Sequence, residues 1–140
     1  MKLAKILVPI DGGDHSAAAV RSAIALAACQ GGQVTLLHCH DRIPNLIGGE
    51  AREELEVELI EEDAEVLKPY AEMLEQAGIE ARLLARGGDP GDLIAREAEL
   101  GGYGVIVMGT QGHTRIGGFL LGSVVQAVLA ATECPVLVVH

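Results

Sequence analysis

A glycine-rich stretch between residues 109 and 123 has the composition of a phosphate-binding loop. Two residues separate Gly109 from Gly112, and nine further residues separate Gly112 from Gly122, which Ser123 follows directly. Because glycine has no β-carbon, its backbone N–H can approach an anion closely, and the N-terminus of a following helix adds the positive end of its dipole. The Ser123 hydroxyl is a further donor. The spacing therefore predicts a loop that holds phosphate groups.

Two common nucleotide-binding motifs do not fit the sequence. Residues 117–123 match the glycine spacing of a Walker A loop, but the Lys that must precede Ser123 is absent. The fingerprint G-x-G-x-x-G is also absent after the first apolar run, where the sequence reads Asp-Gly-Gly-Asp from Asp11. We therefore expect neither a P-loop nor an NAD site, and Asp11 is the candidate acceptor for ribose hydroxyl groups.

The other candidates for chemistry are histidines and cysteines. His38 and His40 lie two residues apart on a predicted strand and so share one face, but no third ligand stands at a characteristic spacing. We expect a core or strand-end role for them, and no metal held by protein side chains alone. We expect Cys29 and Cys134 to be buried packing residues. No Ser–His–Asp or Cys–His arrangement indicates a nucleophile, so no catalytic residue is predicted.

Alternating strands and helices must position these residues. The runs 6–10 and 103–108 are apolar on both faces, which predicts central parallel strands. Asp89 before Pro90 is typical of an N-cap followed by the first helical residue, and Pro69 should kink or split the long second helix before Tyr70. The expected strands are 6–10, 34–39, 79–85, 103–108 and 135–139, and the expected helices are 16–30, from 51 onward, 91–100 and 123–131.

This alternation predicts one doubly wound α/β domain over residues 1–140. We expect a five-stranded parallel sheet in the order 3-2-1-4-5, with helices on both faces. Ligands of such sheets bind beyond the carboxyl ends of the strands where the winding direction reverses, here between the first and fourth strands. Asp11 and Gly109 end these two strands, so we expect them to face one crevice.

The composition excludes several other functions. Ten Lys and Arg against twenty Asp and Glu give a net charge of −10, which repels nucleic-acid backbones, and with no Trp, two Tyr and one Phe there is no aromatic platform for unpaired bases. The N-terminus shows no signal peptide or spanning segment, and three single Cys are typical of a reducing compartment. We therefore expect a cytoplasmic protein with neither nucleic acid nor membrane as a partner.

The segment from Glu50 to Glu65 contains nine acidic residues interleaved with apolar ones. Charge-rich helix faces are ordinary solvation devices, so we interpret this segment mainly as a solvated face. An acidic docking surface is the alternative.

Several segments together resemble the nucleotide-binding branch of the universal stress protein family, over nearly the whole chain. Besides the glycine spacing they are 6–12 with Ser16, 36–38, 88–90, 107–109 and 134–139. The resemblance implies an ATP-binding domain in which Asp11 contacts ribose, main chain near Cys39 contacts adenine, and the glycine loop holds the phosphates. The binding residues that it implies are Pro9, Ile10, Asp11, Cys39, Met108, Gly109, Gly112, His113, Gly122, Ser123 and Val124.

The same resemblance implies a homodimeric stress-response protein that senses ATP, ADP or AMP and hydrolyses ATP slowly at most. His113 stands where the family commonly has Lys or Arg, so we expect backbone dipoles and Mg²⁺ to neutralise most of the phosphate charge. We also predict that Val136–Val139, an apolar edge strand without a charge or interior proline, pairs with a second copy of the chain.

Two alternatives stay open. The segment from Asp11 to Ser16 partly resembles the S-G-G-x-D-S loop of ATP pyrophosphatases, which form adenylates, although Asp11 replaces the first Ser. Pyrophosphate release from ATP would identify such an enzyme. The third interpretation is an interaction module without a ligand, which would contain no nucleotide after purification.

Overall fold

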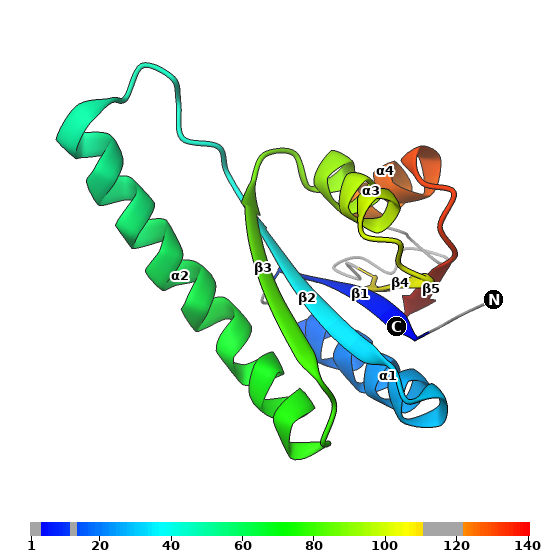
Figure 1. Cartoon of the computed structure of the whole chain (residues 1–140). Helices are drawn as coiled ribbons and strands as arrows, with labels where there is room; N and C mark the ends of the chain where they lie inside the picture. Colours follow the sequence, from blue (N-terminus) through cyan, green and yellow to red (C-terminus); the bar gives the residue numbers. More distant parts are fainter. Residues whose placement is uncertain (1–3, 12–13, 111–121) are drawn as a thin grey trace.

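The structure is a computed structural model that describes residues 4–11, 14–110 and 122–140. In these residues five strands alternate with four helices (Figure 1). The strands are β1 (Lys5–Ile10), β2 (Gln33–His40), β3 (Ala81–Gly87), β4 (Val105–Gly109) and β5 (Val136–Val139), and the helices are α1 (Asp14–Gln30), α2 (Gly49–Gln76), α3 (Pro90–Leu100) and α4 (Ser123–Ala131).

The strands form one parallel sheet in the order β3-β2-β1-β4-β5, which confirms the predicted order. β1 pairs with β2 along its whole length and with β4 at Ile6 and Leu7. The chain runs outward from β1 through β2 to β3, then returns to place β4 on the other side of β1. The winding direction therefore reverses between β1 and β4.

Successive side chains of the central strands point to opposite faces of the sheet and build two apolar cores. Ile6 and Val8 belong to the core that packs against α1 and α2, whereas Leu7 and Ile106 belong to the core that packs against α3 and α4. Figure 1 shows the same division, with α1 and α2 on one side of the sheet and α3 and α4 on the other. The doubly wound class is thereby confirmed.

Pro69 does not split the second helix, so the predicted split was wrong. Figure 1 shows α2 as one continuous helix, with Pro69 inside it. Proline removes one backbone hydrogen bond and crowds the preceding turn. Leu67, Tyr70 and Leu74 are nevertheless buried against the sheet, and packing of an apolar face stabilises a helix more than local propensity does. Tertiary packing therefore compensates for the unfavourable proline and keeps the helix continuous.

The prediction that Cys29 is buried was also wrong, because Cys29 is exposed. The buried face of α1 carries Ala19, Val20, Ala23 and Ala27. Cys29 lies two residues beyond Ala27, which places it roughly 200° around the helix, on the solvent side. Cys134 is partly buried and packs against the core beneath α3 and α4.

The other element boundaries lie close to those predicted. β3 is displaced by two residues relative to the expected 79–85, and α1 begins at Asp14 rather than Ser16. Asp89 caps α3 as predicted, because its carboxylate accepts a hydrogen bond from the backbone N–H of Asp92 at 3.1 Å. Within the described ranges, no helix combines the length and apolar character needed to cross a membrane.

Candidate functional site

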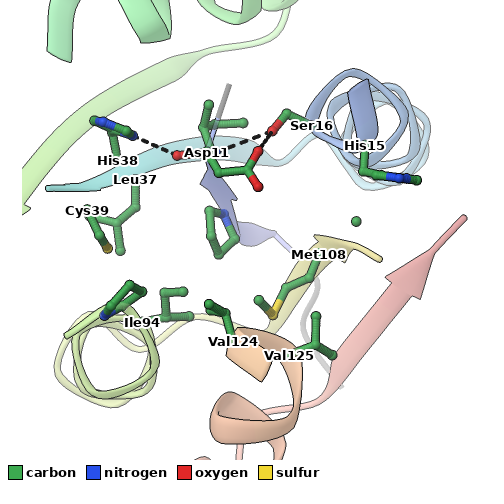
Figure 2. Close-up of a pocket in the computed structure, with 14 residues that line it drawn as sticks. Asp11, His15, Ser16, Leu37, His38, Cys39, Ile94, Met108, Val124 and Val125 are labelled. Carbon is green, nitrogen blue, oxygen red and sulfur yellow. Dashed lines mark hydrogen bonds between the residues drawn. The ribbon is translucent and has the colours of Figure 1, made fainter. Parts of the chain in front are cut away.

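A pocket of about 250 Å³ lies at the carboxyl ends of the central strands, where β1 and β4 meet. Its walls come from β1, β2 and β4, from the first turn of α1, and from the N-terminal turns of α3 and α4 (Figure 2). The lining residues are Pro9, Ile10, Asp11, His15, Ser16, Leu37, His38, Cys39, Pro90, Ile94, Met108, Gly109, Val124 and Val125. An apolar pocket with a few convergent polar groups is typical of a small-molecule site.

Many of the residues predicted from the sequence meet at this pocket. Those that line it are Pro9, Ile10, Asp11, Cys39, Met108, Gly109 and Val124. Gly122 and Ser123 stand at the start of α4 beside Val124 but do not line the pocket. Gly112 and His113 lie outside the described residues.

Gly122 does not need glycine for its backbone conformation. It is the N-cap of α4 with φ −62° and ψ 158°, an extended geometry that any residue adopts. A role for Gly122 in binding would therefore depend on close approach of its main chain to a ligand rather than on left-handed backbone.

Gly109 lies where α1 approaches the end of β4. A β-carbon at Gly109 would stand 2.5 Å from both the Cβ and the carbonyl oxygen of His15, closer than real atoms approach. Only glycine therefore lets the first turn of α1 lie against the end of β4. This close approach brings His15 and Ser16 into the pocket wall beside Asp11.

Seven lining residues were not assigned to the site from the sequence: His15, Ser16, Leu37, His38, Pro90, Ile94 and Val125. The signal for some of them is periodicity. Leu37 is two residues before Cys39 on β2 and so shares its face, and Ile94 is one helical turn after Pro90 on α3. The contact between α1 and the end of β4 has no such local signal, because it depends on tertiary packing.

The Asp11 carboxylate is held by a hydroxyl group of α1. Ser16 Oγ donates a hydrogen bond to Asp11 Oδ1 at 2.9 Å and accepts one from the Asp11 backbone N–H at 3.3 Å. Figure 2 shows the two side chains facing each other at the rim of the pocket, with Ile94, Val124 and Val125 across from them. The pocket therefore has a polar side, formed by Asp11 and Ser16, and an apolar side opposite to it.

A second polar cluster joins the pocket wall to α2. His38 Nδ1 lies 2.8 Å from the Ile10 carbonyl oxygen and so donates to it, since a carbonyl only accepts. The Nε2 atom of the same ring lies 3.6 Å from Asp63 Oδ1, and His40 Nδ1 lies 3.1 Å from Asp63 Oδ2. The shared face predicted for His38 and His40 is confirmed, and Asp63 is the partner that sequence reasoning missed.

Asp63 does carry a sequence signal. It precedes the buried residues Leu67, Tyr70 and Leu74 by four, seven and eleven positions, a spacing that places all four on one helix face. A buried carboxylate on an apolar face requires a hydrogen-bonding partner, and His40 Nδ1 supplies it. Among the described residues, no group of three His, Cys, Asp or Glu side chains could hold a metal ion.

Cys39 is the thiol of the pocket. Burial, followed by the nearby carboxylates of Asp89 and Asp63, raises the pKa of Cys39 from 9.0 to about 11. The thiol is therefore protonated at neutral pH and is a poor nucleophile. The side chain contributes apolar surface to the pocket wall.

Comparisons with known proteins agree with this fold. The model of the universal stress protein family matches residues 2–140. A universal stress protein of Methanocaldococcus jannaschii is 36% identical over 137 residues, which cover 96% of this chain and 81% of the relative. The solved structure of another protein of that organism, also a universal stress protein, has a TM-score of 0.81 at 30% identity and covers 99% of this chain and 96% of that one.

Two further solved structures share the fold at 24% identity, each with a TM-score of 0.71. One is a universal stress protein in complex with cAMP, and it covers 97% of this chain and 95% of that one. The other is a universal stress protein from Archaeoglobus fulgidus in complex with dAMP, with complete coverage of both chains.

Proposed function

This chain belongs to the universal stress protein family, and on that premise we propose that it is an ATP-binding stress-response protein. It acts as a nucleotide-dependent sensor or regulatory module with at most slow ATP hydrolysis. The observation that carries the proposal is the pocket at the reversal point between β1 and β4, where Asp11, Cys39 and Gly109 come together. Crevices at this position of doubly wound sheets are the usual place for nucleotides.

The pocket offers separate surfaces for the parts of a nucleotide. Asp11 accepts hydrogen bonds from ribose hydroxyl groups, and the main chain near Cys39 contacts the adenine edge. The apolar side chains of Ile94, Met108 and Val125 all belong to the core on the α3 and α4 side of the sheet, and they support the flat faces of the base. Pro9 and Ile10 complete the wall at the end of β1.

The phosphates extend toward the glycine loop. Gly109, Gly112, His113, Gly122, Ser123 and Val124 surround them in this proposal, and Mg²⁺ neutralises part of their charge. The start of α4 supports this placement, because backbone N–H groups at a helix N-terminus attract anions. The cAMP and dAMP found in two proteins of this fold support adenine nucleotides as the ligand class.

A binding role fits the pocket better than turnover. Its thiol is kept protonated by burial and by two carboxylates, which argues against covalent catalysis. We therefore infer that nucleotide occupancy is the signal and that a client protein reads it. The protein works as a cytoplasmic homodimer in this proposal.

The first test is to identify the resident ligand by mass spectrometry of small molecules released from freshly purified protein. Calorimetric titrations with ATP, ADP and AMP in the presence of Mg²⁺ then give the affinities. Asp11→Ala should weaken ATP and AMP by similar factors of about tenfold, because both carry the same ribose and a charge-assisted hydrogen bond is worth roughly 1.5–3 kcal/mol. Glu99→Ala, which removes an exposed carboxylate at the far end of α3, is the control and should leave both affinities unchanged.

Three outcomes separate the proposal from its alternatives. Release of an adenine nucleotide, with weaker binding by the Asp11 variant, supports it. No bound nucleotide and no thermal shift with ATP and Mg²⁺ would indicate an interaction module without a ligand. Pyrophosphate formation from ATP and a carboxylate acceptor would indicate an adenylating enzyme.

A further inference from the structure

Ser16 is a buried hydroxyl residue that forms two hydrogen bonds with one other residue of the pocket. Only 4% of Ser16 is exposed, and it lies in the first turn of α1, a helix anchored in the core by Ala19 and Val20. Its Oγ accepts from the Asp11 backbone N–H at 3.3 Å and donates to Asp11 Oδ1 at 2.9 Å (Figure 2). The hydroxyl thus fixes both the main chain and the side chain of Asp11.

Asp11 needs such support, because it is exposed and follows the last residue of β1. An exposed aspartate samples several rotamers, and ordering it during binding costs entropy. A buried donor on a rigid helix removes that cost by holding one rotamer before the ligand arrives. A carboxylate has about four acceptor positions, so the bond from Ser16 does not saturate it.

We propose that Ser16 is a positioning residue that makes the pocket selective for ribonucleotides over deoxyribonucleotides. The inference rests on the proposed nucleotide-binding function and specifies which nucleotides the site prefers. With the rotamer fixed, the acceptor oxygens of Asp11 point in one direction. A ribose hydroxyl must lie in that direction to donate a hydrogen bond to them. A sugar without that hydroxyl leaves the Asp11 acceptor without a donor from the ligand, which lowers the affinity for that sugar. Without Ser16 the carboxylate loses the buried donor that fixes this rotamer, and the discrimination weakens.

The structure of α1 makes the substitution Ser16→Ala a clean one. Alanine is smaller than serine by one oxygen atom and is the best helix former, so the helix should be preserved. Ser16→Cys is a second variant, which keeps a side chain of similar shape but offers only a weak donor. Ser22→Ala, six residues further along the same helix and outside the pocket lining, is the matched control.

The test compares ATP with 2′-deoxy-ATP and 3′-deoxy-ATP by calorimetry. The wild-type protein should bind ATP about tenfold more tightly than at least one deoxy analogue. Ser16→Ala and Ser16→Cys should lower the affinity for ATP by roughly three- to tenfold while that analogue binds as before, so the preference shrinks to about twofold or less. Ser22→Ala should keep the preference of the wild-type protein.

A double-mutant cycle distinguishes positioning from a general structural effect. In the Asp11→Ala background, Ser16→Ala should have no further effect on ATP, because the group that it orients is gone. Additive losses, or an unchanged preference for ribose in a folded Ser16→Ala protein, would overturn the role of Ser16 while nucleotide binding stands. A wild-type protein that binds none of the three nucleotides would overturn the proposed function as well.

Discussion

At the scale of single residues, Cys39 lies in a buried environment and Cys29 in an exposed one. Cys39 lines the pocket at the end of β2, where burial and the carboxylates of Asp89 and Asp63 raise its pKa to about 11. Cys29 lies on the solvent side of α1. Because the thiolate is the reactive form of cysteine, the two thiols should differ greatly in their reaction with alkylating agents.

We expect iodoacetamide at pH 8 to label Cys29 rapidly and Cys39 slowly in the native protein. With a pKa near 11, about one Cys39 side chain in a thousand is ionised at pH 8, and this fraction rises about tenfold for each pH unit up to that value. Labelling of Cys39 should therefore accelerate between pH 8 and pH 10, as followed by peptide mass spectrometry. Equal labelling rates for Cys39 and Cys29 at pH 8 would contradict the environment described for Cys39.

The sequence predicted the location of single residues well where that location depends on strand ends. Asp11 and Gly109 directly follow or end apolar runs, so the rule for doubly wound sheets was enough to bring them to one crevice. Ser16 was recognised as part of a helix start and of the family resemblance, but its bond to Asp11 was not predicted, because it depends on how α1 packs. Asp63 was taken for one more solvated carboxylate, although its helical phase with Leu67 indicates burial.

At the scale of elements, α2 has two distinct parts. Its C-terminal half is buried through Leu67, Tyr70 and Leu74, whereas acidic and apolar side chains of the N-terminal half face solvent, including Val57 (55% exposed) and Ile60 (68% exposed). The expectation of a solvated acidic face therefore describes the glutamates of this segment. Asp63 is the exception, because it is 6% exposed and contacts two histidines of β2.

Asp63→Ala should lower the free energy of unfolding by about 1–3 kcal/mol, because it leaves His40 Nδ1 without its buried acceptor. Urea unfolding followed by circular dichroism measures this change. Glu62→Ala, one residue earlier on the same helix and exposed, removes the same charge and should change stability by less than about 0.5 kcal/mol. If the two variants were equally stable, the cluster would contribute nothing to the packing of α2 on β2.

The element boundaries show why local signals have limits. The α4 boundaries match the prediction at both ends, and the N-cap of α3 was recognised from Asp89 and Pro90 alone. Pro69 predicted a kink or a split in α2, but the helix continues past it because buried apolar residues lie on both sides of the proline. The apolar face that they form is buried because α2 packs against β2 and β3, a tertiary contact that local sequence signals do not encode.

At the scale of the whole molecule, the sheet order leaves β3 and β5 as the two edge strands. The edges differ in charge, since β3 carries the exposed residues Arg82 and Arg86 whereas Val136–Val139 carries no charge. Charged residues on an edge strand oppose pairing with another strand, and an apolar edge favours it. This asymmetry supports the proposal that two copies of the chain pair through β5.

Leu137→Lys should convert the proposed dimer into a monomer with the fold intact. Val136 and Val138 pack against the core beneath α3 and α4, whereas Leu137 lies between them in the strand, is 40% exposed and belongs to neither apolar core. Its replacement therefore removes little packing but places two like charges near each other across a two-fold axis. Leu83→Lys on β3, also a partly exposed leucine on an edge strand, is the matched control and should leave the mass unchanged. Sedimentation equilibrium gives the masses, and a Leu137→Lys protein with the mass of the wild-type dimer would show that the copies associate through another surface.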